Sequence, residues 1–487
     1  MYSGFHLKSL GLLTDLYQLT MAYGYFKAGK AEEEAVFNLY FRKNPFKGGY
    51  VLAAGLENAI EYINDFHYSE EEIAYLRTLT GNDGDALFSE DFLEYLKNLQ
   101  FTCSIAAIPE GTAVFPNEPL MRVTGPILQC QLLETPLLTI INFQSLIATK
   151  ASRIRNIAPQ DTLMEFGLRR AQGPDGGISA SRAAYIGGFD GTSNVLAGKL
   201  FHIPVKGTHA HSWVMSFDNE IESFDAYAAF LPNNVTLLVD TYDTIEGVKN
   251  AIKTGLTLRE RGYQLAAIRL DSGDLAYLSI EARKLLDEAS FQETGIVASN
   301  DLDEHLIASL KNQGAPINIW GVGTNLVTAS DNPALGGVYK LAALKNKVGQ
   351  WEYKIKLSEQ TIKINTPGIQ QVRRYQNKDG FAGDMIFNIE TPPMDNPVMI
   401  DPLDFTKKRS FGSDDSFEDL LVDIYTNGQL VYDVPTIEQI RKRVANQLSN
   451  LHIGIKRFAN PHIYPVGLEE QLFDLKTSLI LQLRENK

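Results

Sequence analysis

From about residue 203 onward, short apolar runs alternate with segments whose apolar residues recur at helical spacing. The runs that predict strands are 203–206, 235–239, 265–270, 295–298, 317–322 and 338–343. Between them, one-sided apolar faces predict helices, as in the sets Ile245/Val248/Ile252/Leu256 and Leu278/Ala282/Leu285/Leu286/Ala289. Strands that are apolar on both faces and joined by helices are typical of a parallel β/α architecture. So many units in succession favour a barrel over an open sheet.

Small and polar residues follow nearly every one of these strands. They are the runs 207–211 (Gly-Thr-His-Ala-His), 240–243 (Asp-Thr-Tyr-Asp), 271–274 (Asp-Ser-Gly-Asp), 299–301 (Ser-Asn-Asp) and 321–325 (Gly-Val-Gly-Thr-Asn). In β/α barrels the carboxyl ends of the strands converge on one face, where the active site is built. Purely structural loops have no need of carboxylates, glycines and hydroxyls at successive strand ends. The pattern therefore predicts an enzyme active site at this face.

The rest of the chain predicts further regions around the barrel. A helix is expected to begin near Asp15, and residues 35–135 mix strand-like runs with helical stretches. Beyond residue 345 the sequence is more polar and includes a basic stretch, and the last fifty residues have a mostly helical pattern. We expect an α/β sandwich at 1–140, the barrel at 141–375, and a return to the sandwich with a small, mostly helical C-terminal cap at 376–487.

Charge and composition limit the classes of function. The chain has 487 residues and a net charge of −14, so binding to nucleic acid or to an anionic membrane surface is not expected. The sequence shows neither an apolar run long enough to span a bilayer nor the pattern of a signal peptide. Two cysteines, Cys103 and Cys130, have mostly apolar neighbours, which is typical of buried thiols in a reducing compartment. We therefore expect a cytoplasmic protein.

His209 and His211 lie two residues apart after the first predicted strand, and the residues alone leave three interpretations open. Imidazoles at this spacing can share a zinc ion if the strand continues through both, although no further histidine or cysteine lies at a suitable spacing. Either ring is also of the kind that a carbonyl satisfies in a protein core. The third interpretation is a nucleophile or an acid–base group.

Glycine-bearing turns after two of the strands suit a bound phosphate. Ser272–Gly273 and the run 321–324 offer backbone N–H groups and hydroxyls without a bulky side chain in the way. A tight turn is the simpler explanation of either one alone. The sequence contains no P-loop, no dinucleotide-binding glycine motif at a helix start and no Gly-x-Ser-x-Gly elbow. ATP use through a P-loop, a dehydrogenase and an α/β-hydrolase are therefore disfavoured.

Taken together, these motifs resemble the nicotinate phosphoribosyltransferase family. The matching runs are 14–21, 41–46, 165–176, 187–194, 207–212, 269–275 and 321–325, and 356–359 and 366–368 extend the match. Several are long and unusual in composition, and they follow one another in order. The resemblance implies a type II phosphoribosyltransferase fold. In that fold an N-terminal α/β sandwich packs on an irregular, incomplete β/α barrel, and a homodimer completes each active site.

The resemblance also implies a reaction. Nicotinate and phosphoribosyl pyrophosphate would give nicotinate mononucleotide and pyrophosphate with coupled ATP hydrolysis, as a step of NAD salvage. His211 would be the histidine that ATP phosphorylates, whereas position 209 varies in the family and carries no role. Tyr17 of the neighbouring subunit and Phe166 would sandwich the pyridine ring, and Arg169 and Ser193 would lie near its carboxylate.

The remaining roles concern the phosphoribosyl group and the metal. By position in the motifs, the phosphoribosyl group and its phosphate would be held by Arg269, Asp271, Ser272, Gly273, Gly323 and Thr324. Asp240 and Asp274 are candidates for contacts with magnesium and ribose. The expected cofactors are therefore Mg²⁺ and, as a co-substrate, ATP.

The chemistry of the reaction suits these residues, and two alternatives differ from it. The pyridine nitrogen is itself the nucleophile, so the enzyme stabilises a cationic ribose centre and a departing pyrophosphate. A nicotinamide phosphoribosyltransferase has an Asp where this chain has Ser193, and a carboxylate there would repel nicotinate. An inactive barrel protein that only binds ligands is the other alternative, but none of the motifs is broken. The decarboxylating quinolinate enzyme shares the fold class without needing ATP or the histidine motif.

Overall fold

The computed structural model describes residues 9–360 and 363–485, and the chain forms two compact units. Unit 1 comprises residues 1–146 and 334–487, and unit 2 comprises residues 147–333. The chain therefore leaves unit 1 once and returns to it. The return comes earlier than expected: residues 334–375 belong to unit 1 and not to the barrel, because β12 (Gly337–Lys345) pairs antiparallel with β1 (Glu34–Phe41).

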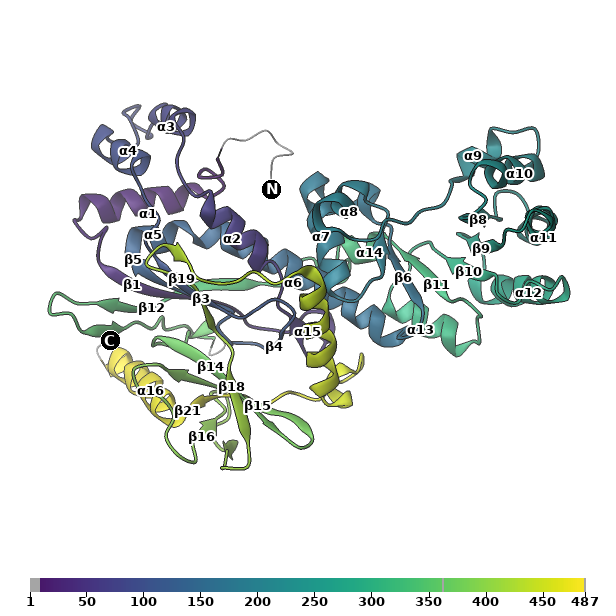
Figure 1. Cartoon of the computed structure of the whole chain (residues 1–487). Coiled ribbons are helices and arrows are strands. Elements are labelled where there is room, and N and C mark those ends of the chain that lie inside the picture. The colour runs from purple at the N-terminus through teal and green to yellow at the C-terminus, as the bar shows by residue number, and fades with distance from the viewer. Residues whose placement is uncertain (1–8, 361–362, 486–487) are drawn as a thin grey trace. The chain divides into compact units, whose positions relative to one another are not determined.

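Unit 2 is built on a six-stranded, all-parallel sheet that curls into an incomplete barrel (Figure 1). The strand order is β7 (Gly191–Thr192), β6 (Thr162–Glu165), β11 (Ile319–Val322), β10 (Gly295–Ala298), β9 (Leu265–Leu270) and β8 (Val235–Leu238). The parallel β/α architecture is thus confirmed, as are the strands predicted at 235–239, 265–270, 295–298 and 317–322. All of these strands are largely buried, as their apolar sequences require.

Helices carry the chain between the strands of unit 2. They are α6 (Glu134–Ile157, which begins in unit 1), α7 (Gly173–Ile186), α8 (Val195–Phe201), α9 (His211–Met215), α10 (Glu220–Phe230), α11 (Thr244–Glu260), α12 (Leu275–Glu288), α13 (Glu304–Asn312) and α14 (Thr324–Val327). Aspartate side chains cap the N-termini of three of these helices. Asp243, Asp274 and Asp303 accept hydrogen bonds from backbone N–H groups in the first turns of α11, α12 and α13. Such caps satisfy donors that have no partner within the helix.

Two of the predicted barrel strands are wrong. The run 203–206 forms only an isolated bridge between Thr192 and Val205, because Pro204 cannot donate to a ladder. The run 338–343 is a strand, but its partner is β1 of unit 1. Apolar alternation identifies a strand without identifying the sheet to which it belongs. In their place, β6 and β7 complete the parallel sheet.

Unit 1 contains two larger sheets. One is antiparallel with the order β13 (Trp351–Tyr353), β12, β1, β5 (Met121–Pro126), β3 (Ser104–Ala107), β19 (Val422–Thr426) and β20 (Gln429–Leu430). The other has the order β17 (Lys408–Ser410), β16 (Val398–Ile400), β21 (Val466–Glu469), β15 (Gly380–Asn388), β14 (Gln370–Asn377) and β18 (Ser416–Asp419). In the described part of the chain, residues 376–487 supply seven strands to these two sheets, and their C-terminal part contains α15 (Ile437–Asn450) and α16 (Glu470–Glu485).

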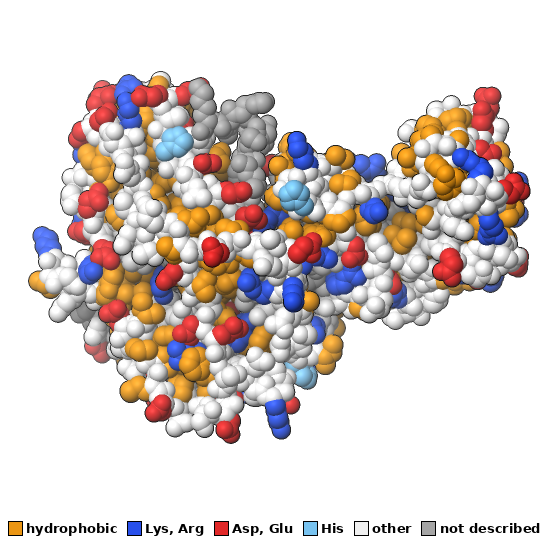
Figure 2. Space-filling view, viewed as in Figure 1, with side chains coloured by type: hydrophobic (Ala, Val, Ile, Leu, Met, Phe, Trp, Pro, Cys, Tyr) orange, Lys and Arg blue, Asp and Glu red, His pale blue; other side chains and the backbone are white. Residues whose placement is uncertain are grey.

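Further features of the chain concern its surface charges, its cysteines and its helices. Charged side chains of both signs are interspersed over the face seen in Figure 2. Cys103 and Cys130 are free, buried thiols. Within the described residues, no helix combines the length and the apolar character that crossing a membrane requires. The helix expected near Asp15 is α1 (Leu16–Lys27), although the Asp15 side chain does not cap it.

Candidate active site

The predicted site residues of unit 2 follow the carboxyl ends of its parallel strands. Phe166 follows β6, Ser193 follows β7, and the loops with Asp240, Asp271 and Gly323 follow β8, β9 and β11. Because parallel strands end at one edge of a sheet, these residues are brought to the same face. All of these residues belong to unit 2.

His211 is the first residue of α9, and its ring lies between two oxygen atoms. Its Nδ1 is 3.1 Å from Oγ1 of Thr241, within hydrogen-bond distance. Its Nε2 is 3.8 Å from Oδ2 of Asp271, and the His211 side chain is 39% exposed. The ring is thus oriented by Thr241 on one side, and the side chain as a whole is partly exposed, as that of a nucleophile must be. Thr241 belongs to a polar run seen in the sequence, but no role was predicted for it.

His209 lies in a different environment. Its Nε2 accepts the backbone N–H of Leu238 at 3.2 Å, on the unpaired edge of β8, and its ring packs 4.9 Å from that of Tyr227. Burial lowers the pKa of His209 to about 4, so the ring is neutral near neutral pH. Of the three interpretations, the structure therefore supports that of a structural histidine in the protein core for His209. Its hydrogen bond to β8 fixes the loop that carries His211.

A set of hydrogen bonds joins β9 to its neighbours around Arg269. The guanidinium donates to Oγ of Ser299 at 2.9 Å, to Oγ1 of Thr208 at 2.9 Å and to Oδ1 of Asp271 at 3.0 Å. Asp271 Oδ1 also accepts from the Ser299 hydroxyl. Arg269 and Asp271, both predicted, are thus brought together, whereas Ser299 and Thr208 were only parts of the predicted strand-end runs.

Asp240 tests whether a cation fits the site. Its Oδ2 accepts from the backbone N–H of Asp271 at 2.8 Å and from the Ser272 hydroxyl at 2.7 Å. Its Oδ1 is buried and has no hydrogen-bond partner within the described structure. A buried carboxylate oxygen without a donor is a natural ligand for Mg²⁺. Asp274 is engaged differently, because its Oδ1 accepts the N–H groups of Ala276 and Tyr277 as the cap of α12.

Phe166 rests on two glycines of β11 and its loop. A Cβ atom on Gly321 would lie 2.7 Å from the Phe166 ring, and one on Gly323 would lie 3.2 Å from the Phe166 carbonyl oxygen. A side chain at Gly321 would therefore displace the ring, and one at Gly323 would press on the backbone of Phe166. The guanidinium carbon of Arg269 lies 5.8 Å from the centre of the same ring. The strand end therefore presents an aromatic face next to a cation, which suits a stacked anionic ring.

The other predicted residues lie in turns and loops or on helices of the two units. Arg169 is exposed in a 3-10 turn (Leu168–Arg170), and Ser193 is half-buried. Gly273 has a φ of +77° in the loop after β9, which glycine adopts without strain. Thr324 begins α14. Tyr17 is 49% exposed on α1 of unit 1. Its contact with a pyridine ring bound in the site of a neighbouring subunit stays a prediction.

A group of acidic residues elsewhere in unit 2 could suggest a metal site. Glu304, His305 and Asp331 offer ligand atoms within 4.8 Å of one another. However, the Lys150 ammonium lies 2.8 Å from Oε2 of Glu304 and 2.7 Å from Oδ1 of Asp331. Arg153 also pairs with Glu304 at 2.8 Å. Cationic side chains thus already neutralise the carboxylates of this group. Among the described residues, neither His209 nor His211 belongs to such a group, so the zinc interpretation has no support.

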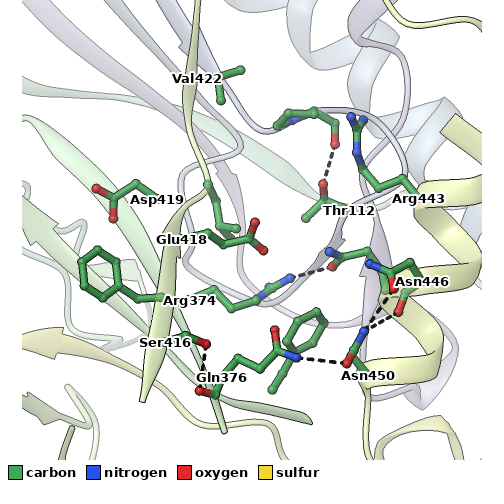
Figure 3. Close-up of a pocket in the computed structure, with 15 residues that line it drawn as sticks. Thr112, Arg374, Gln376, Ser416, Glu418, Asp419, Val422, Arg443, Asn446 and Asn450 are labelled. Carbon is green, nitrogen blue, oxygen red and sulfur yellow. Dashed lines mark hydrogen bonds between the residues drawn. The ribbon is translucent and has the colours of Figure 1, made fainter. Parts of the chain in front are cut away.

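A cavity of about 500 Å³ lies in unit 1 and contains none of the predicted site residues (Figure 3). It is lined by residues of β14, β18 and α15, among them Arg374 and Glu418. Arg374 is 1% exposed and donates to Asp384, to Gln447 Oε1 at 2.7 Å and to the Ala113 carbonyl at 2.7 Å. This guanidinium therefore joins the sheet to α15.

Comparisons with known proteins agree along the chain. Models of the nicotinate phosphoribosyltransferase N-terminal domain, family and C-terminal domain match residues 12–142, 162–360 and 369–476. The nicotinate phosphoribosyltransferase of Bacillus subtilis is 44% identical over 486 residues, which cover 99% of this chain and 97% of the relative. The crystal structure of human nicotinic acid phosphoribosyltransferase matches with a TM-score of 0.84 and 34% identity, covering 96% of this chain and 99% of that one.

A more distant structure matches in fold. The nicotinate-nucleotide pyrophosphorylase of Pyrococcus furiosus has a TM-score of 0.69 at 21% identity, covering 91% of this chain and 96% of that one. Together with the human structure, it supports the predicted fold class.

Proposed function

The chain belongs to the nicotinate phosphoribosyltransferase family, and we propose that it transfers the phosphoribosyl group of phosphoribosyl pyrophosphate to nicotinate with coupled ATP hydrolysis. The products are nicotinate mononucleotide and pyrophosphate, as in NAD salvage. One observation carries the proposal: His211 lies between Thr241 and Asp271, at the strand ends where Arg269 also pairs with Asp271.

In the transfer step, the pyridine nitrogen forms a bond to C1′ of the ribose while the bond from C1′ to the pyrophosphate oxygen breaks. No general base is needed, because the nitrogen lone pair is the nucleophile. The Phe166 face and the half-buried Ser193 would orient nicotinate, with Arg169 near its carboxylate. Arg269 supplies positive charge, and the loops with Ser272–Gly273 and Gly323–Thr324 supply backbone and hydroxyl donors for phosphate.

In the coupling step, Nε2 of His211 takes the γ-phosphoryl group of ATP and ADP leaves. Water then attacks phosphorus, so that phosphate leaves and the imidazole is regenerated. If Nδ1–H donates to Thr241, the lone pair that attacks phosphorus is at Nε2. Phosphorylation adds about −1.5 to −2 units of charge. We propose that this charge changes the affinity for phosphoribosyl pyrophosphate and that its hydrolysis drives turnover.

Mg²⁺ is part of the proposal. Oδ1 of Asp240, which has no hydrogen-bond partner among the described residues, suits it as a ligand, and Asp274 is a weaker candidate because one of its oxygens caps α12. When bound, Mg²⁺ would offset the negative charge of the phosphates near Asp271.

The assembly and compartment are proposed on separate grounds. The exposed Tyr17 on α1 supports a homodimer in which each subunit completes the other's site. The two free, buried thiols support a cytoplasmic location.

One experiment tests the reaction. The purified chain is incubated with nicotinate, phosphoribosyl pyrophosphate and Mg²⁺, with and without ATP, and nicotinate mononucleotide is quantified by chromatography. We expect product in both mixtures and a faster rate with ATP. Nicotinamide is supplied in a parallel set. Faster turnover of nicotinamide would favour a nicotinamide phosphoribosyltransferase, and no product from either base would favour an inactive binding protein.

A further inference from the structure

Glu165 is a buried residue at the end of β6 that has no role in the reaction as proposed. It is 1% exposed. Its carbonyl accepts the Ser193 N–H at 2.9 Å, and the next residue, Phe166, donates its N–H to the Val322 carbonyl at 2.8 Å. Glu165 therefore lies between two loops: residues 166–170, which carry Phe166 and Arg169, and the loop that follows Thr192 of β7 and carries Ser193. Both loops have predicted contacts with the pyridine ring.

The Glu165 carboxylate accepts hydrogen bonds from residues next to both Phe166 and Ser193. Its Oε1 accepts the Gly167 N–H, in the first loop. Its Oε2 accepts the Thr192 hydroxyl at 2.5 Å, at the end of β7 where the second loop begins, and the Ser181 hydroxyl at 2.8 Å, on α7. One side chain thus links the residue after Phe166 to the residue before Ser193.

A second set of bonds extends the link beyond Ser193. The Asn194 N–H donates to Thr192 Oγ1 at 2.9 Å, and its amide nitrogen donates to Ser181 Oγ at 3.3 Å. Its amide oxygen accepts the N–H of Ala197 and so caps α8. Thr192, Ser181 and Asn194 are at most 2% exposed. Ser193 is therefore held on both sides by a buried network that centres on Glu165.

The packing around Gly167 leaves no room for a looser arrangement. A Cβ atom there would lie 2.2 Å from a methyl group of Val327 and 3.0 Å from Glu165 Oε1. Within the described residues, the Glu165 carboxylate has only neutral donors and forms no ion pair. Its interactions are thus directional hydrogen bonds, which set geometry, and each lost bond leaves a buried group unsatisfied.

We propose that Glu165 is a positioning residue that fixes the separation of the Phe166 face from Ser193, and thereby the discrimination between a pyridine carboxylate and a pyridine amide. The inference rests on the proposed function. The ring must fit against Phe166 while its substituent reaches Ser193, so a shift of either loop changes which substituent is accepted. Displacements of about 1 Å in such positions can change rates by up to about 100-fold.

Three variants separate positioning from general stability. Glu165→Ala removes every acceptor. Glu165→Gln keeps the shape: its oxygen can accept the Gly167 N–H while its NH₂ donates to the Ser181 and Thr192 hydroxyl oxygens, which have other acceptors for their protons. The matched control is Asp161→Asn at the opposite end of β6, where the carboxylate accepts from Trp320 at 2.8 Å and from Lys311 at 2.6 Å.

Steady-state kinetics give the first readout. For Glu165→Ala we expect the KM for nicotinate to rise about tenfold or more and the preference for nicotinate over nicotinamide to fall by a similar factor. The KM for phosphoribosyl pyrophosphate should change less than about twofold. Glu165→Gln should keep most of the preference for nicotinate over nicotinamide. Asp161→Asn should keep this preference in full, even if its Tm falls as much as that of Glu165→Ala. The inference would be overturned if Glu165→Ala kept the wild-type preference for nicotinate. It would also be overturned if Glu165→Gln or Asp161→Asn lost as much of this preference as Glu165→Ala.

Amide hydrogen exchange gives a second readout that does not depend on activity. Exchange at Gly167 and Asn194 should accelerate in Glu165→Ala and not in Glu165→Gln or Asp161→Asn. If Glu165→Ala does not fold, Ser181→Ala removes one donor from α7 and should give a smaller effect in both readouts. A wild-type chain that makes no nicotinate mononucleotide would refute the proposed function, whereas unchanged exchange at Gly167 and Asn194 in Glu165→Ala would refute the role of Glu165.

Discussion

The imidazole of His211 and the hydroxyl of Thr241 lie within hydrogen-bond distance, with 3.1 Å between Nδ1 and Oγ1. Thr241 comes from the loop after β8, so the orientation of the proposed phosphate acceptor depends on a neighbouring strand end. Asp271, from the loop after β9, approaches the other nitrogen at 3.8 Å. The two neighbours differ in kind: the Thr241 hydroxyl orients the ring, and the Asp271 carboxylate places negative charge next to the nitrogen that is proposed to react.

Removing the hydroxyl tests this orientation. Thr241→Val keeps the shape but loses the hydrogen bond, so we expect phosphorylation of His211 by ATP to slow about tenfold, which corresponds to about 1.4 kcal/mol. The rate is measured as acid-labile phosphate transferred from γ-labelled ATP. Thr236→Val, on β8 itself, is the matched control and should retain the wild-type rate. Equal rates in Thr241→Val and wild type would show that the hydroxyl does not orient the ring.

Removing the imidazole tests the coupling. His211→Ala should abolish ATP hydrolysis and the acid-labile phosphate, while slow ATP-independent formation of nicotinate mononucleotide remains, because the pyridine nitrogen needs no base. Phosphate release and product formation are measured in the same reaction mixture. If the variant still hydrolysed ATP at the wild-type rate, another residue would be the acceptor.

Much of the site could be predicted from the sequence, because each strand and the polar residues after it form one short, continuous segment of the chain. The strands 265–270 and 295–298 and the polar residues after them lie where the apolar runs predicted. The partners of Glu165 could not be predicted in this way, because Ser181 and Thr192 are 16 and 27 residues away and meet it only through the fold. The sequence likewise shows no sign that α9 begins at His211.

The identity of residue 193 should select the pyridine substrate. A carboxylate in Ser193→Asp would repel the carboxylate of nicotinate and accept a hydrogen bond from the amide of nicotinamide. We expect kcat/KM for nicotinate to fall at least about tenfold and that for nicotinamide to rise. Both constants are measured with saturating ATP and phosphoribosyl pyrophosphate. Ser193→Asn, which has similar size without the charge, is the control. If it lost as much activity on nicotinate, size would decide the selection and not charge.

The partnerless oxygen of Asp240 gives a prediction about Mg²⁺. Asp240→Asn can still accept from Asp271 N–H and the Ser272 hydroxyl, but it loses the negative charge of Oδ1. We expect the Mg²⁺ concentration for half-maximal activity to rise about 10- to 100-fold. Asp243→Asn in the same loop removes an equal charge and still caps α11, so its Mg²⁺ dependence should match that of the wild type. Identical Mg²⁺ titrations of Asp240→Asn and wild type would exclude Asp240 as a ligand.

His209 should make the stability of the chain depend on pH. Its pKa is about 4 in the folded chain because of burial, against about 6.5 for an ordinary histidine. Between these values the unfolded chain binds more protons, so the free energy of unfolding falls as the pH falls from about 6.5 towards 4, in total by about 3 kcal/mol. His209→Gln still offers an acceptor to the Leu238 N–H but does not titrate, so this part of the pH dependence should disappear.

Chemical denaturation at several pH values between 7.5 and 4.5 measures the effect, and the slope matters more than the absolute stability, which the substitution can also change. His202→Asn is the control, because His202 is exposed and Asn tolerates the left-handed backbone that ends α8. Its slope should match that of the wild type. A wild-type slope in His209→Gln would mean that this ring is not held neutral in the folded chain. A flatter slope would show that the histidine nearest His211 in the chain is structural.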